Sequence, residues 1–256
     1  MARMTCEFFS EALTKQTTMM VVLPDKPLKN EDGTIKPYPT LYLLHGFSDD
    51  HSMWTRQTSV ERYANERGLA VVMPDVDHSF YTDMRYGKKY WTFLTEEVPN
   101  KARFFFPLSD RREDNFVAGL SMGGYGAFKW LLNQPDQFAA GASLSGVLDL
   151  ANHEQVDQGD NPKNQSVFNA FGGENLVGTS HDIFHLAKQV DQLAGLKPKL
   201  YHACGTEDFL FDHNVRFKEL TDTLSLDIET IFDPGEHEWG YWDHHIKQVI
   251  NWLPIQ

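Results

Sequence analysis

The feature that most constrains the fold is a regular alternation of short apolar runs with amphipathic segments along the whole chain. Several runs are almost continuously apolar, as strands covered on both faces of a sheet are. The strand-like runs occupy residues 18–23, 40–46, 69–75, 115–121, 139–146, 199–205 and 227–233. Helix-like patterns lie between them at residues 58–68, 125–135, 213–224 and 241–253. This alternation predicts an α/β protein with one mostly parallel sheet and helices on both faces.

All residues from 1 to 256 are expected to form a single domain, because no shift in composition and no internal repeat divides the chain. The alternation is interrupted only at residues 147–198, where about fifty residues separate two predicted strands. This segment contains acidic and Asn-rich sections. It is predicted to be an insertion of short helices above the sheet.

The overall composition indicates a folded, acidic protein. Hydrophobic residues make up 41% of the chain and aromatic residues 13%, so a sizeable core can be buried. The 23 lysines and arginines against 36 aspartates and glutamates give a formal net charge of −13. Such acidity argues against nucleic acids and anionic membranes as partners. A small-molecule substrate is the expected partner, and self-association into a homo-oligomer is left open.

The cysteines and the N-terminus bear on location. Cys6 and Cys204 are far apart and form no metal-binding spacing, so they are expected to be free thiols in a reducing compartment. Glu7 and Glu11 stand where a signal peptide needs an apolar core. The apolar run nearby is too short to span a bilayer. These observations predict a cytoplasmic protein.

The most informative motif is GLSMG at residues 119–123, between a predicted strand and a predicted helix. A G-x-S-x-G sequence in that context places its serine on a sharp turn, where flanking glycines avoid steric clashes. The start of the following helix also brings positive dipole and free N–H groups beside the serine. Ser121 is therefore predicted to be a catalytic nucleophile, with the 147–198 insertion overhanging it.

A serine nucleophile needs a base, and the base needs an acid that orients it. Where G-x-S-x-G lies at a strand–helix turn, the three groups follow in the order Ser, Asp or Glu, His. Asp208 comes just after the strand at 199–205, and His237 lies between the last predicted strand and the last predicted helix. We therefore expect Asp208 to be the acid and His237 the base. Glu207 and Asp212 are the rival acids.

Other histidines fit the role of base less well. His244 and His245 lie inside the last predicted helix, and His202 lies within a strand, so solvated or packed positions are expected for them. His45 stands at a strand end just before a turn glycine, which favours a structural role.

The sequence HDIFH gives His181 and His185 the spacing of a helical metal pair. It lacks the glutamate of H-E-x-x-H, and no third ligand is evident. We therefore expect no metal site and no cofactor.

Stabilisation of a tetrahedral oxyanion requires two backbone N–H groups. Met122, directly after the nucleophile, is expected to supply one of them. The loop after the strand at 40–46 is expected to supply the other from Phe47, with Gly46 giving close access.

Taken together, these motifs resemble the esterase D-like branch of the α/β-hydrolases, and most closely the bacterial tributyrin esterases. The matching segments are LYLLHGFSDDHSMW, VVMPD with SFYTDMRYG, GLSMGGYGAFK, CGTEDFL and HEWGYWD, and they span nearly the whole chain. The resemblance implies an α/β-hydrolase fold. It also assigns Ser121, Asp208 and His237 to the family's triad, and Phe47 and Met122 to its oxyanion donors.

The resemblance implies a serine carboxylesterase that hydrolyses acetyl to butyryl esters through an acyl-enzyme, without a cofactor. Two other enzymatic functions remain open, namely S-formylglutathione hydrolase and a carbohydrate esterase that removes acetyl or feruloyl groups. A binding protein on an inactive hydrolase fold is disfavoured, because such proteins usually lack a member of the triad.

Aromatic side chains are predicted to close a small acyl pocket. Trp54, Phe168 and Phe171 are the candidates for substrate binding, with Tyr81 and Tyr86 nearby in the expected layout. Phe168 and Phe171 are three residues apart, so they would share one face of a helical turn. Ordinary packing in the core is the competing explanation for all of these aromatic residues.

Overall fold

A computed structural model describes residues 1–30, 32–152 and 162–255 of the chain. Within these residues an eight-stranded sheet has the order β1-β2-β4-β3-β5-β6-β7-β8. β2 is antiparallel to both β1 and β4, whereas the strands from β4 to β8 pair in parallel. The strands are β1 (Ala2–Ser10), β2 (Lys15–Leu23), β3 (Thr40–Leu44), β4 (Ala70–Pro74), β5 (Asn115–Leu120), β6 (Ala140–Leu144), β7 (Lys199–Gly205) and β8 (Ile228–Asp233).

Each strand-like run of the sequence corresponds to one of the strands β2 to β8, and β1 is the strand that the sequence pattern did not indicate. Most side chains of β1 are exposed or half-buried, and only Phe8 and Ser10 are buried. An edge strand with so little burial has a weak hydrophobic pattern. What defines β1 as a strand is its antiparallel pairing with β2, in which Ala2 lies opposite Leu23.

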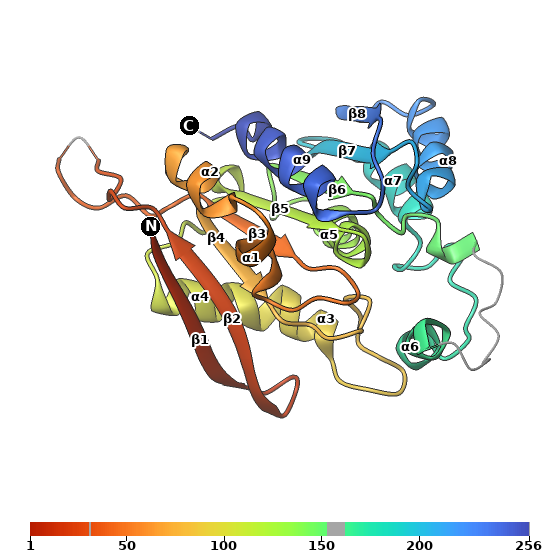
Figure 1. Cartoon of the computed structure of the whole chain (residues 1–256), viewed down its shortest axis with the longest axis horizontal. Helices are drawn as coiled ribbons and strands as arrows, with labels where there is room; N and C mark the ends of the chain where they lie inside the picture. Colours follow the sequence, from red (N-terminus) through yellow and green to blue (C-terminus); the bar gives the residue numbers. More distant parts are fainter. Residues whose placement is uncertain (31, 153–161, 256) are drawn as a thin grey trace.

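Two layers of helices cover the sheet, as Figure 1 shows. One buried cluster joins the sheet to α3, α4, α5, α7 and α8, and a second cluster on the other face joins it to α1, α2 and α9. The helices are α1 (Met53–Gln57), α2 (Val60–Glu66), α3 (Tyr90–Thr92), α4 (Val98–Phe105), α5 (Met122–Asn133), α6 (Pro162–Phe171), α7 (Ile183–Asp191), α8 (Phe211–Thr221) and α9 (Trp239–Trp252). This strand order with two helical layers is the α/β-hydrolase fold that the sequence predicted.

The predicted insertion at 147–198 includes residues 153–161, which lie outside the described residues; the described part holds two helices in different settings. Helix α7 buries Ile183, Leu186 and Val190 and packs against α5, so it is a crossover helix between β6 and β7. Helix α6 lies beyond the carboxyl ends of the strands (Figure 1), and its C-terminal end joins the first buried cluster through Ala170 and Phe171. No helix of the described residues is long and apolar enough to cross a bilayer.

A lysine is buried in the layer of helices on one face of the sheet. Lys129 of α5 is only 1% exposed, and its Nζ donates a hydrogen bond of 2.8 Å to the carbonyl oxygen of Tyr81. The same Nζ lies 4.7 Å from the centre of the Trp91 ring. Burial lowers the pKa of Lys129 to about 7. The contact to Tyr81 connects α5 to the loop after β4.

We expect the replacement Lys129→Met to change the pH dependence of stability. A free lysine titrates at about 10.4, so between roughly pH 7 and 10 the unfolded chain holds a proton that the folded chain has released. The free energy of unfolding of the wild type should therefore rise with pH relative to that of Lys129→Met. Urea denaturation at neutral and alkaline pH measures the difference. Lys218→Met, at a half-exposed lysine of α8, is the control, and a pH-independent difference for Lys129→Met would contradict the assignment.

Candidate active site

Ser121 occupies a strained turn between β5 and α5. Its φ is 53° and its ψ is −118°, in the left-handed half of backbone space that residues with a side chain seldom adopt. Its amide donates a hydrogen bond of 2.8 Å to the carbonyl oxygen of Leu144 at the end of β6. A Cβ at Gly119 would lie 2.2 Å from the carbonyl oxygen of Gly123, and one at Gly123 would lie 2.4 Å from that of Leu44. The two glycines of the motif therefore permit the turn.

Three side chains predicted from the sequence meet in one hydrogen-bonded chain. The Oγ of Ser121 lies 3.1 Å from Nε2 of His237. The Nδ1 of His237 lies 2.8 Å from Oδ2 and 3.0 Å from Oδ1 of Asp208. With the proton on Nδ1, the ring donates to the carboxylate, and Nε2 is left to accept the hydroxyl proton. This geometry is that of a nucleophile, a base and an orienting acid.

The environment of Asp208 keeps its carboxylate charged. Its side chain is fully buried, and burial alone raises its pKa. Hydrogen bonds from His237 and from the Leu210 amide, the latter 2.8 Å long, outweigh that effect and hold the pKa of Asp208 below its ordinary value. A buried carboxylate that remains ionised can fix the tautomer of the imidazole and stabilise a positive charge on it.

The rival acids lie elsewhere. Glu207 is exposed, and its Oε2 accepts a hydrogen bond of 2.6 Å from the amide of Gly235. Asp212 is exposed in the first turn of α8. Asp208 is thus the one of the three acids for which a hydrogen bond to His237 is recorded in the described part of the chain.

The rival histidines have other partners. His45 is buried, and its Nε2 accepts a hydrogen bond of 3.1 Å from the amide of Val76. His202 is buried 2.8 Å from Oδ1 of Asn214, and burial lowers its pKa to about 4. His244 and His245 lie on α9, where burial lowers the pKa of His245.

The HDIFH sequence is a helix start and not a helical metal pair. Asp182 is the N-cap of α7, and its carboxylate accepts hydrogen bonds from the amides of Phe184 and His185. His181 therefore precedes the helix, so it does not share a helical face with His185. Burial lowers the pKa of His181 to about 3.

Of the two expected oxyanion donors, Met122 directly follows the serine in the chain, and Phe47 comes from the loop after β3. Met122 is the first residue of α5, so its N–H has no acceptor within the helix. Phe47 follows β3 and lines the same cleft as Ser121. The loop that carries Phe47 is fixed by two contacts, from the Tyr81 hydroxyl to the His45 carbonyl at 2.7 Å and from the Gly46 amide to Oδ2 of Asp49 at 3.1 Å.

Ser121 and His237 open into a cleft of about 490 Å³. Phe209 is 68% exposed beside it, and its ring centre lies 4.4 Å from that of His237. The cleft is lined by Gly46, Phe47, Ser48, Asp49, Leu120, Ser121, Lys163, Phe209, His237, Glu238, Trp239 and Trp242. The sequence analysis did not single out Phe209, Trp239 and Trp242. Their positions next to Asp208 and His237 in the chain were the available signal.

The three aromatic residues expected to bind substrate do not line this cleft. Trp54 is buried, its Nε1 donates to the Leu44 carbonyl at 3.0 Å, and its ring supports Trp239 from behind. Phe171 is buried against Phe80, so it belongs to the core.

Phe168 lies on the same helix as Phe171, but its ring stacks on the ring of Tyr86. The shared face of α6 is therefore directed toward the 80–86 segment, which explains why neither phenylalanine reaches the serine.

Comparison with known proteins matches residues 10–253 to a family model described as "Putative esterase". An acetyl esterase of Caldicellulosiruptor saccharolyticus is 32% identical over 262 aligned positions, which cover 99% of this chain and 98% of that protein.

Two solved structures are similar over almost the whole chain. The fluorophosphonate-binding serine hydrolase FphF of Staphylococcus aureus superimposes with a TM-score of 0.88 at 39% identity, covering 98% of both chains. The S-formylglutathione hydrolase FrmB of Staphylococcus aureus superimposes with a TM-score of 0.86 at 38% identity, also covering 98% of both chains.

Proposed function

The chain belongs to the esterase family, and from that premise we propose that it hydrolyses short-chain acyl esters through an acyl-enzyme formed on Ser121. Carboxylic ester hydrolysis on an α/β-hydrolase fold is what the family membership establishes. The observation that carries the finer proposal is the unbroken chain of hydrogen bonds from Ser121 through His237 to Asp208.

In the acylation step, Nε2 of His237 takes the proton of the Ser121 hydroxyl as Oγ attacks the ester carbonyl carbon. The imidazolium that forms is stabilised by the Asp208 carboxylate. The same proton then passes from His237 to the leaving alcohol when the tetrahedral intermediate collapses. Water, deprotonated by His237, attacks the acyl-enzyme and releases the acid.

The developing negative charge on the carbonyl oxygen needs donors that are already in place. We assign the N–H groups of Met122 and Phe47 to this role. The assignment of the Met122 amide is supported by its place at the start of α5, where the helix dipole adds positive potential. The Phe47 amide is supported by the fixed loop after β3, which Tyr81 and Asp49 hold.

The preference for short acyl groups is supported by the aromatic wall of the cleft and by the acetyl esterase relative. The thioester S-formylglutathione is the second candidate substrate, because FrmB shares the fold and 38% of aligned residues. Both substrates use the same acyl-transfer chemistry. A panel of p-nitrophenyl esters from acetate to octanoate, assayed beside S-formylglutathione, separates the two.

The replacement Ser121→Ala should abolish ester hydrolysis, because it removes the attacking oxygen. The small change in volume should leave the fold intact. Labelling with a fluorophosphonate probe, followed by intact mass, measures the loss of the nucleophile directly. An alanine variant that still becomes labelled would show that another residue attacks.

The replacement Asp208→Asn should lower kcat by roughly 10⁴-fold, as expected when the orienting carboxylate of a triad is lost. Asp212→Asn is the matched control, because Asp212 is four residues away and exposed on α8. Steady-state kinetics on p-nitrophenyl acetate measures both variants. A larger effect of Asp212→Asn than of Asp208→Asn would show that Asp208 is not the acid.

The replacement Phe209→Ala should shift the acyl-chain preference toward longer esters, because it removes an exposed ring from the wall of the cleft. The wild type should prefer esters in the range from acetate to butyrate, and its activity should have declined by about octanoate. The decline should be gradual, since each methylene changes discrimination by only about 1–3 kcal/mol. The readout is the ratio of kcat/KM for octanoate and butyrate esters.

The matched control is Phe171→Ala, which removes a buried ring outside the cleft. It should lower the free energy of unfolding by about 3–5 kcal/mol and leave that ratio unchanged. If the ratio shifted in Phe171→Ala and did not shift in Phe209→Ala, the acyl pocket would be lined by α6 instead.

A further inference from the structure

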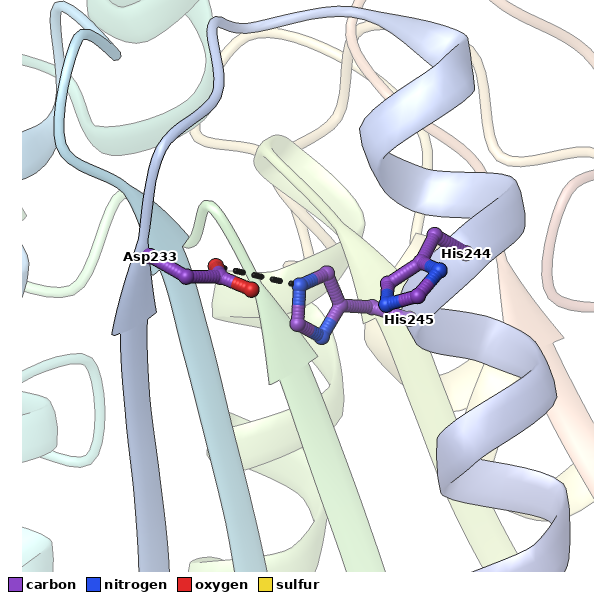
Figure 2. Close-up of side chains that lie close together, drawn as sticks. All are labelled: Asp233, His244 and His245. Carbon is purple, nitrogen blue, oxygen red and sulfur yellow. Dashed lines mark hydrogen bonds and ion pairs between the residues drawn. The ribbon is translucent and has the colours of Figure 1, made fainter.

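Three metal-ligating side chains come together outside the catalytic cleft. Asp233 ends β8, and His244 and His245 are neighbours on α9. One ligand atom from each of the three residues lies within 4.8 Å of the others. Figure 2 shows the His245 ring extending from α9 toward the Asp233 carboxylate, with the His244 ring beside it.

The closest pair in this group already has the spacing of two ligands on one ion. Oδ1 of Asp233 lies 3.3 Å from Nε2 of His245. Two ligand atoms at about 2.0–2.1 Å from a tetrahedral zinc ion lie roughly 3.3–3.4 Å apart. His244 is exposed, and its Nε2 lies 2.5 Å from the side-chain nitrogen of Gln248. Its ring would therefore supply the third ligand either through Nδ1 or by releasing that contact.

The hydrogen bonds behind this pair favour a cation between its members. The Tyr201 hydroxyl donates to Oε1 of Gln248 at 3.0 Å, so its oxygen is the acceptor that faces Nδ1 of His245 at 3.3 Å. A neutral imidazole with its proton on Nδ1 then turns the lone pair of Nε2 toward the carboxylate of Asp233. Two acceptors that face each other repel, and a metal ion converts both into ligands.

The remaining partners of the group orient the carboxylate. The Tyr241 hydroxyl donates a hydrogen bond of 2.8 Å to Oδ1 of Asp233. Such contacts from a second layer hold ligands in place at metal sites. The Asp233 side chain is 37% exposed and that of His245 is 0% exposed, so an ion entering from solvent would pass Asp233 and meet His245 below it.

We propose that Asp233, His244 and His245 bind a divalent transition-metal ion of the zinc type, with water completing the coordination. Two imidazoles and one carboxylate suit zinc better than magnesium or calcium, which prefer sets of oxygen ligands. The ion would tie the end of β8 to α9. These two elements border the loop that carries His237, so the site would brace that loop without entering the reaction.

The test uses the full chain without a histidine tag, after treatment with a chelator. Titration with zinc chloride in a calorimeter should show uptake of about one ion per chain, and zinc should raise the Tm. Cobalt(II) as a probe should give visible absorption of a four- or five-coordinate centre. His244→Gln and Asp233→Asn should weaken zinc binding by at least about tenfold.

His185→Gln is the matched control, because it removes a histidine of α7 that is not part of the group. It should bind zinc as the wild type does. His244 is exposed, so His244→Gln is expected to fold, and circular dichroism checks this. Failure of the wild type to bind zinc would overturn the proposal and indicate a purely hydrogen-bonded network with the proton on Nε2. Undiminished binding by His244→Gln would also overturn it, because the ion would then sit elsewhere.

Discussion

The left-handed backbone of Ser121 is the constraint on which the site depends. A non-glycine residue in such a conformation costs about 1–3 kcal/mol and persists only where its surroundings hold it. Here the hold comes from the centre of the sheet, because β5 lies between β3 and β6. The Ser121 amide is bound to the end of β6, and Gly123 presses against the carbonyl of Leu44 at the end of β3. These contacts therefore fix the turn, and the Ser121 hydroxyl is held 3.1 Å from Nε2 of His237.

Asp208 and His237 reach that place because the carboxyl ends of parallel strands share one edge of the sheet. Asp208 follows β7 and His237 follows β8, two strands that pair in parallel. The loops after them are joined by the hydrogen bond from the Gly235 amide to Glu207. Glu207, which the sequence offered as an alternative acid, thus secures the loop that carries His237. The buried His45 has a similar supporting part after β3, since its ring accepts the Val76 amide and its carbonyl accepts the Tyr81 hydroxyl.

The fold class could be predicted from the sequence, and so could the meeting of Ser121, Asp208 and His237 at one edge of the sheet. Both predictions follow from the order of the strands and the positions of the motifs. It was insufficient for β1, whose exposed edge position leaves almost no hydrophobic signal. The residues that line the cleft could not be predicted from the sequence either. Phe171 and Phe209 are equally aromatic in sequence, and only the packing of α6 against Phe80 shows which of them is buried. The link between Asp233 and the histidines of α9 likewise depends on how β8 and α9 are placed in three dimensions.

The aromatic residues that follow Asp208 and His237 in the chain contact the His237 ring and also line the cleft. The Trp242 ring meets His237 edge-on at 4.8 Å, while its Nε1 donates to Oγ of Ser145 at 3.1 Å after β6. The Phe209 ring also contacts this imidazole, with ring centres 4.4 Å apart. A change at either position therefore alters the cleft and the support of His237 together. Ser48 and Lys163 line the cleft from segments that hold none of the three hydrogen-bonded residues. The Nζ of Lys163 lies 5.7 Å from the centre of the Phe209 ring, so a change at Lys163 would also reach His237 through that ring.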